Sequence, residues 1–422
     1  MYIETHILQS FVPSNPNRDE TGNPKSADFG GARRARISSQ SLKYAIRHSA
    51  EFEPMRGDLG TRTQFLGRLL DEPLREQGKK DEHDIETVVR AMAEALKKDK
   101  GQRNKQAGEA AEEDESELVE DEPYEAAEER QPEPAKKDPS EHGGIDSERA
   151  AVMLFLAPDE LPKLVSSLVA NWDKLLQEAK RGESRAARAI WQGLWKHSEE
   201  KLPTSAPDIA LFGRFLAKYP IMDIDAASQF AHAISTHRTD VEQDYFTAVD
   251  DLATEEERGA AMLGDIMFHS ATYYRYSCVD WDQLVASLHG DRRLASQALE
   301  CFLLADVRAI PGGKKHSFGH DDAPDFVLGV VREHSQPLSL ANAFEKPIRR
   351  SEEGFVAPSI RQLDHYWAQI TRVYGAKDVH PVACLVRDEV ELPALGSALV
   401  PSLNDWLTKL LSFLPSAAEA IP

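Results

Sequence analysis

The stretch from Ser14 to Arg47, SNPNRDETGNPKSADFGGARRARISSQSLKYAIR, decides how the rest of the chain is interpreted. Residues 1–50 hold seven lysines and arginines against four acids, in a chain whose formal net charge is -21. Long-range repulsion by so acidic a protein opposes polyanion binding over the whole surface. A basic segment therefore predicts that any nucleic acid is held locally.

A short helix is expected to begin within this stretch. Ser38 or Ser39 can cap it, and Lys43 and Arg47, four residues apart, share one of its faces. A capped helix start with two cations one turn further on suits a phosphate group. From composition alone, the plainer interpretation is favoured, namely a solvated basic loop beside an ordinary capped helix.

The segments around this helix have their own patterns. Residues 2–9 alternate β-branched and aromatic types, which predicts a strand of a central sheet. The prolines and glycines between residues 15 and 31 predict a turn-rich loop that brings Arg18 and Lys25 to the same backbone. Arg34 and Arg36 are expected to alternate onto one cationic face of a short extended run.

Four blocks of the sequence carry a resemblance to a known family. The first block, from His6 to Arg47, reads HILQSFVPSNPNRDETGNPKSADFGGARRARISSQSLKYAIR. It is similar to the N-terminus of CasC-type backbone subunits of type I-E CRISPR Cascade complexes, in the RAMP superfamily. The other blocks are AHAISTH from Ala231, DYFTAVDD from Asp244 and PLSLANAFEK from Pro337, in the family's order. The resemblance implies an α+β fold: a modified ferredoxin-like, RRM-like palm with a helical fingers insertion and a β-hairpin thumb.

These patterns divide the chain into four expected parts. Residues 1–60 form the first part of the palm, 61–230 the helical fingers, 231–275 the thumb hairpin, and 276–422 the rest of the palm with C-terminal helices. Within the fingers, residues 101–143 hold fifteen acids against five bases and almost no large apolar side chains. Such a segment predicts a disordered surface insertion, because it cannot bury enough surface to offset its ordering entropy. A solvated linker is favoured over a nucleic-acid mimic.

The resemblance also implies which residues bind the guide RNA. Phosphate and sugar contacts are expected from Arg18, Lys25, Ser38, Gln40, Lys43 and Arg47. Arg214 is expected to support a phosphate and Phe215 to pack on a displaced base, although a helix end in the core explains both about as well. The thumb wedge is expected from Tyr245 and Phe246, with Thr247 and Val249 packed around it. From the residues themselves, Lys314 and Lys315 on a glycine-rich loop are weak candidates for a further phosphate contact.

The implied function is non-catalytic. Several copies of the chain are expected to polymerise head to tail along one CRISPR RNA, together with other Cascade subunits. Such a filament presents the guide for pairing with target DNA, so that base pairing carries the specificity. The alternative is a metal-dependent RNase that uses Asp19 or Asp28. No carboxylate or histidine partner for either residue is evident in the sequence.

Composition indicates the cellular setting of the protein. The hydrophobic content of 41% and charged content of 29% are those of a soluble globular protein. The sequence has no apolar run of eighteen residues and no signal-peptide pattern, so we expect a cytoplasmic protein without membrane contact. The three cysteines have no metal-site spacing. His316, His320, Asp321 and Asp322 lie on one glycine-rich loop, which makes a poor metal site, so we expect neither metal nor cofactor.

Overall fold

The structure, a computed structural model, describes residues 1–79, 81–96, 149–194, 203–216, 223–248, 262–385 and 390–415. The expected insertion over 101–143 and the expected thumb residue Val249 lie outside these ranges. The chain divides into two compact units. Unit 1 comprises Met1–Pro54, Ser228–Leu284 and Arg292–Pro422, and unit 2 comprises Met55–Ala227 and Val285–Asp291.

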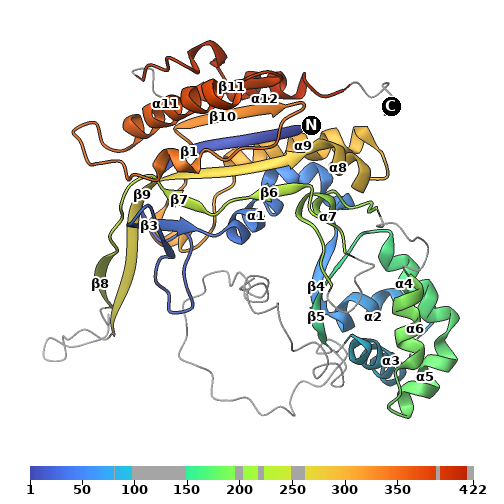
Figure 1. The fold of residues 1–422 in the computed structure, drawn as a ribbon. Helices are drawn as coiled ribbons and strands as arrows, with labels where there is room; N and C mark the ends of the chain where they lie inside the picture. The colour runs from blue at the N-terminus through green and yellow to red at the C-terminus, as the bar shows by residue number, and fades with distance from the viewer. Residues whose placement is uncertain are drawn as a thin grey trace, which may run out of the picture. The chain divides into compact units, whose positions relative to one another are not determined.

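Unit 1 is built on an antiparallel sheet in which nine strands are described. β1 (Tyr2–Ser14) lies inside the sheet, between β10 (Phe326–Arg332) and β9 (Met262–Asp280) (Figure 1). The strand order is β11-β10-β1-β9-β7-β3-β2, and β6 and β8 also pair with β9. The remaining strands are β2 (Ser26–Phe29), β3 (Ala32–Ile37), β6 (Ser228–Phe230), β7 (Ala233–Ser235), β8 (Glu242–Ala248) and β11 (Val379–Leu385).

The predicted N-terminal strand is confirmed and is longer than expected. Residues 3–9 of β1 are all buried, because elements pack on both faces of the sheet. On one face, Tyr274 packs with Leu8 and Phe344. On the other, Tyr273 packs with Phe11 and with Leu42 of the first helix. The mixture of helices with an antiparallel sheet is that of an α+β fold.

Helices and segments of 3-10 helix complete unit 1. The helices are α1 (Ser39–Arg47), α8 (Trp281–Ser287), α9 (Arg292–Arg308), α10 (Lys315–Phe318), α11 (Val356–Tyr374) and α12 (Leu403–Leu411). The 3-10 segments are η1 (Ala50–Asp58), η4 (Ala341–Phe344) and η5 (Gly396–Ala398). α8 and η1 each cross a boundary between the two units.

Unit 2 is mainly helical, with one small sheet. Its elements are β4 (Thr61–Phe65), α2 (Leu66–Glu76), α3 (Glu82–Ala95), β5 (Arg149–Leu156), α4 (Glu160–Ala170), α5 (Trp172–Lys180), α6 (Arg185–Leu194) and α7 (Pro207–Phe212). The apolar stripes of the helices meet in one core, in which Trp191 is fully buried and donates its indole N–H to the carbonyl of Met92 at 3.1 Å.

Two segments of unit 2 differ from the helical pattern expected for them. Residues 61–65 and 149–156 are strands that pair antiparallel with each other, with Arg62 opposite Phe155. The helical periodicity begins only after each strand, at Leu66 and Glu160. A strand whose partner lies far away in the sequence gives little local signal, since pairing and burial decide its structure.

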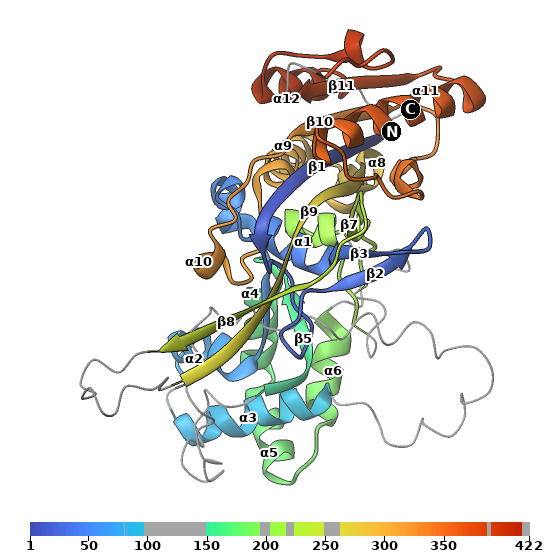
Figure 2. The ribbon, with the colours of Figure 1, turned by 90° about the vertical axis from the view of Figure 1, so that its left-hand side faces the viewer.

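The expected hairpin of unit 1 is present, but its arms differ from those expected. Within the predicted thumb hairpin, the sequence favours residues 231–239 and 269–279 as the two arms around a polar middle. Instead β8 pairs with the first part of β9, from Glu242 opposite Phe268 to Ala248 opposite Met262. β9 then continues into the central sheet as one long strand (Figure 2). The polar run that holds Tyr245 and Phe246 is therefore itself a strand.

The cysteines and the helices bear on the expected cellular setting of the protein. Cys278 and Cys301 are free thiols, and Cys278 is buried. Over the ranges given above, no helix combines the length and the apolar character that crossing a bilayer requires.

Candidate nucleic-acid interface

The start of α1 is fixed by contacts with distant segments. Ser38 is the N-cap, and its hydroxyl accepts a hydrogen bond from the backbone N–H of Ser41 at 3.2 Å. The N–H of Ser38 donates to the side-chain oxygen of Asn17 at 2.8 Å, and that of Ser39 donates to Nδ1 of His232 at 2.9 Å. The cap predicted from the sequence is confirmed. Ser38 is 7% exposed, so its hydroxyl organises the helix start.

The predicted basic loop lies against this helix start. The N–H of Lys25 donates to the carbonyl of Asn17 at 2.9 Å, and the N–H of Arg36 donates to the carbonyl of Lys25 at 3.0 Å. Arg18 pairs with Pro24 as an isolated β-bridge. Arg18 and Lys25 thus lie on the two facing sides of one small loop, beside the residue that also holds the cap.

Asp19 closes the tip of that loop. One of its carboxylate oxygens accepts hydrogen bonds from the N–H of Thr21 at 3.0 Å, the hydroxyl of Thr21 at 2.7 Å and the N–H of Asn23 at 2.9 Å. Partial burial by itself raises the pKa of the carboxyl group, but these hydrogen bonds outweigh it and hold the pKa below its ordinary value. Asp28, the other candidate acid, is exposed and lies 3.9 Å from Arg33.

The cations of α1 follow the cap. Lys43 and Arg47 are half-buried, and the ammonium of Lys43 lies 5.5 Å from the centroid of the Phe230 ring. Gln40 is also half-buried, in the first turn. α1 has no acidic residue, so nothing within the helix opposes the positive potential of its first turn.

The three arginines of β3 have three different environments, which corrects the expected cationic face. Arg34 is fully buried, and its guanidinium donates to the carbonyls of Ser235 and Phe344, both at 2.8 Å, with longer bonds to Phe29 and Glu345. Arg33 is exposed beside Asp28. Arg34 therefore joins β3 to two distant segments and is unable to reach a ligand.

Arg36 is a residue that our sequence interpretation omitted from the site. Its side chain is half-buried, and its Nε atom is buried with no hydrogen-bond partner in the described part of the chain. It lies next to Lys25 and two residues before the cap Ser38. The repeated arginines of the motif indicate a basic site, but the sequence does not show which of them is buried and which is able to contact a ligand.

A second loop lies against the first. A Cβ atom placed on Gly313 would lie 2.4 Å from the carbonyl oxygen of Pro16, so the backbones of the two loops are in close contact. Lys314 follows in the left-handed conformation, and Lys315 begins α10 with an ion pair to Asp321 at 2.6 Å. The two predicted lysines are therefore brought to the basic loop, and one of them has an acidic partner.

Two of the polar residues of this second loop, His320 and Asp322, hold it in place. His320 contacts the carbonyl of Pro311 at 3.1 Å, and Asp322 accepts a hydrogen bond from the N–H of Val12 at 3.1 Å. Among the described residues, no group of three His, Cys, Asp or Glu side chains has the arrangement to hold a metal ion.

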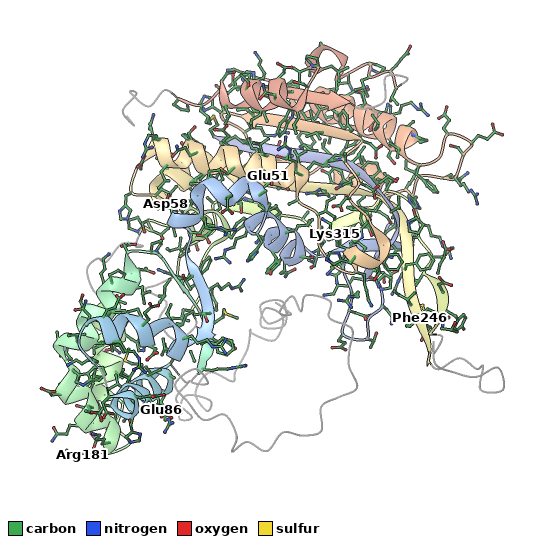
Figure 3. The ribbon with its side chains drawn as sticks, turned by 180° about the vertical axis from the view of Figure 1, so that it is seen from behind. Glu51, Asp58, Glu86, Arg181, Phe246 and Lys315 are labelled. Atoms are coloured by element: carbon green, nitrogen blue, oxygen red, sulfur yellow. The ribbon has the colours of Figure 1, made fainter. Side chains whose placement is uncertain are left out.

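The base of the β8–β9 hairpin meets both loops. The side-chain amide of Asn15 donates to the carbonyl of Met267 at 2.9 Å, and Phe268 packs on Phe318 of α10 with ring centroids 5.8 Å apart. Figure 3 labels Lys315 on α10 and Phe246 on the hairpin. The basic loop, the lysine loop and the hairpin base thus form one connected surface of unit 1.

The two aromatic residues of the hairpin lie on opposite faces, since side chains alternate along a strand. Tyr245 is 65% exposed and faces Asp265 across the ladder, whereas Phe246 is 47% exposed and covers Gly264. A Cβ atom on Gly264 would lie 2.4 Å from the Phe246 ring. Thr247 is exposed. The expected wedge therefore presents one aromatic ring on each face of a ribbon.

Arg214 and Phe215 belong to unit 2, where the arginine is buried with a structural partner and the phenylalanine is exposed. Arg214 is 6% exposed and forms an ion pair with Glu160 at 2.7 Å and a hydrogen bond to the carbonyl of Phe155 at 3.0 Å. Removing it from that carboxylate would leave a buried charge unpaired. Phe215 is 62% exposed and open to contact.

Comparison with known proteins identifies relatives over nearly the whole chain. The family model described as CT1975-like protein matches residues 3–409. A chain of the solved structure titled "CRISPR RNA-guided surveillance complex, pre-nicking" is 28% identical, with a TM-score of 0.74 over 98% of this chain and 99% of that one. A chain titled "CRISPR RNA-guided surveillance complex" is 24% identical, with a TM-score of 0.67 over the same shares, and shows the likeness of fold. No curated protein matches.

Proposed function

Because the chain belongs to the family of CT1975-like proteins, we propose that it is a CRISPR RNA-binding subunit of a Cascade-like surveillance complex. The likeness to a chain of an RNA-guided complex along almost its full length supports this proposal. The observation that carries it is the surface of unit 1 where two basic loops, the acid-free start of α1 and an aromatic hairpin base are joined.

Electrostatics and shape explain how this surface binds RNA. Arg18, Lys25, Lys43 and Arg47 supply positive charge, and the backbone of α1 supplies the positive end of a helix dipole. None of these groups reads the edge of a base, so the grip suits a guide whose sequence varies. Arg36 joins them in our proposal, because a half-buried guanidinium is stabilised by an anion.

The finer assignment follows the sequence resemblance. We propose a type I-E, CasC-type backbone subunit with an RRM-like palm in unit 1 and fingers in unit 2. Its copies bind head to tail on one guide RNA, beside other Cascade subunits, and leave the bases for pairing with target DNA. The acids Glu242, Asp244 and Asp265 make phosphate an unfavourable partner for the hairpin, so its rings are the parts that contact RNA. The cytoplasm is the compartment we propose.

We also propose that the subunit is not an enzyme. The hydrogen bonds of Asp19 are made within its own loop, and Asp28 faces Arg33, so each carboxylate has a local structural partner. Incubation of the complex with complementary RNA and Mg²⁺ tests this point. Cleavage that disappears in Asp19→Ala or Asp28→Ala would establish the metal-dependent RNase instead.

Lys43 provides the test of RNA binding. We expect Lys43→Ala to weaken binding about equally for guides of different sequence and to lower the slope of log K against log salt by roughly one unit. Fluorescence anisotropy with labelled RNAs at several salt concentrations measures both. Arg33→Ala is the matched control, because it removes an exposed cation that already has an acidic neighbour. A loss that depends on the guide sequence, or an unchanged slope, contradicts the proposal.

A further inference from the structure

The small sheet of unit 2 carries an aromatic ring with two arginines on it. The guanidinium carbon of Arg68 lies 4.4 Å from the centroid of the Phe65 ring, and that of Arg149 lies 4.3 Å from the same centroid. Phe65 ends β4, Arg68 lies in the first turn of α2, and Arg149 begins β5 opposite Phe65. Figure 1 shows where these three elements lie in the ribbon.

Among the described residues, no acidic side chain balances the charge of this arginine pair. Both side chains belong to exposed residues, and within the described ranges neither forms an ion pair. The first turn of α2 has no acidic residue. Other cations of unit 2 do have acidic partners, such as the half-buried Arg75 with Asp71 at 2.7 Å and the exposed Arg90 with Glu86 at 2.6 Å.

The ring gives the pair its chemical character. An arginine stacked on an aromatic face is ordered before it binds, so less side-chain entropy is lost when a ligand arrives. The edge of each guanidinium offers a fork of N–H donors that matches the oxygens of a phosphate group. Met153, 40% exposed, lies four residues after Arg149 in β5 and offers apolar contact to a sugar or base.

We propose that Arg68 and Arg149, held by Phe65, form a second nucleic-acid site that binds the sugar-phosphate backbone. This site goes beyond the proposed function, because the guide interface described above lies in unit 1. In a complex of that kind, guide RNA and target DNA both present the phosphodiester chemistry that two ordered arginines recognise. The two sources are distinguished by experiment.

The test uses the full-length chain and the double variant Arg68→Gln/Arg149→Gln, with labelled single-stranded RNA and labelled duplex DNA as separate probes. We expect affinity for at least one probe to fall roughly tenfold per arginine, since each bond to a charged group contributes about that much. The salt slope for that probe falls by roughly one unit per phosphate contact. A loss with RNA alone assigns the site to the guide, and a loss with DNA alone assigns it to the target.

Two further variants separate the arginine pair from general charge effects. Arg75→Gln/Arg90→Gln removes the same charge from unit 2 at residues that have acidic partners, and we expect little change in affinity. Phe65→Leu keeps both charges but removes the ring, so affinity falls while the salt slope stays near that of the unchanged chain. The proposal would be overturned if the two double variants bound each probe equally well and had the same thermal unfolding midpoint. Failure of the Lys43 test would overturn the proposed function and leave this result standing.

Discussion

At the scale of single residues, the motif GGARRAR shows how identical side chains acquire different roles. Arg34 is enclosed by four backbone carbonyls, Arg33 lies in solvent beside an acid, and Arg36 is half-buried with an unpartnered Nε atom. The carbonyls around Arg34 come partly from segments 201 and 310 residues away in the sequence. No local pattern contains that information.

The glycines before these arginines give a matched pair of substitutions. Gly30 has a φ of +58°, and a Cβ atom on it would lie 1.6 Å from the carbonyl oxygen of Glu345, which itself accepts a hydrogen bond from Arg34. We expect Gly30→Ala to lower the free energy of unfolding by about 2–4 kcal/mol, since left-handed strain and a backbone clash add. Urea unfolding measures the change.

Gly31→Ala serves as the control for this prediction. Gly31 has a φ of +71° with open space around its Cα, so only the left-handed conformation is penalised, by about 1 kcal/mol. Equal losses for the two variants would show that the approach of Glu345 to Gly30 has no energetic weight.

The candidate site could be predicted from the sequence where the signals are local. The cap at Ser38 and the cations of α1 follow from spacing within one helix. The ion pair of Arg214 with Glu160, 54 residues earlier, has no local signal, because such pairing is decided by packing. Arg36 was missed for the same reason, since burial and not residue type distinguishes it from Arg33.

At the scale of elements, local periodicity predicted helices better than strands. The sequence predicts helices at residues 292–305, 361–375 and 401–411, and the observed α9, α11 and α12 lie close to these positions. The sequence predicts helix over β4 and β5, because helical periodicity follows soon after each strand. The observed arms of the hairpin differ from the predicted ones because the polar sequence of β8 resembles that of a loop. The strand structure of these residues comes from their pairing with β9.

The hairpin gives the element-level prediction, which contrasts its two faces. Phe246 covers Gly264 across the ladder, so we expect Phe246→Ala to destabilise the hairpin by about 0.5–1 kcal/mol and to speed amide exchange in β8. Tyr245→Ala should leave exchange nearly unchanged, because its more exposed ring faces solvent beside Asp265.

RNA binding by the same two variants separates packing from stacking. If Tyr245 stacks on a base, its removal costs binding by roughly 1–3 kcal/mol without any change in exchange. Faster exchange in Tyr245→Ala than in Phe246→Ala would refute this division of the two faces.

At the scale of the whole molecule, acidity and local basic surfaces coexist. The net charge of -21 opposes indiscriminate polyanion binding, and the cations of unit 1 and the arginine pair of unit 2 are exceptions placed on defined elements. We therefore expect nucleic-acid binding at each of these surfaces to weaken strongly as the salt concentration rises.

Global stability should depend on pH through His269. This residue is 3% exposed at the base of the hairpin and contacts the Tyr273 hydroxyl at 2.5 Å. Burial, with a smaller effect of nearby His237, lowers its pKa to about 4. Because an unfolded histidine has a pKa near 6.5, the unfolded chain takes up a proton that the folded chain does not, and stability falls as the pH drops from about 6.5 towards 4.

We expect this single group to remove about 2 kcal/mol of unfolding free energy between pH 7 and pH 5. Urea unfolding at the two pH values, compared with His269→Gln, isolates the contribution. The variant should lose correspondingly less stability than the unchanged chain over this interval. Parallel losses in both proteins would mean that His269 is not the titrating group.

The position of β1 has a consequence for the order in which the chain is made. β1 is synthesised well before both of its partners, β9 and β10, which come from residues 262–280 and 326–332. Most of unit 2, over Met55–Ala227, emerges between them and can build its own core from contacts within that stretch. During that time Ile3, Ile7 and Leu8 have no strand to pair with, and loop closure over this distance makes their pairing slow. A nascent or truncated chain therefore carries a folded unit 2 behind an apolar N-terminal strand that is open to aggregation.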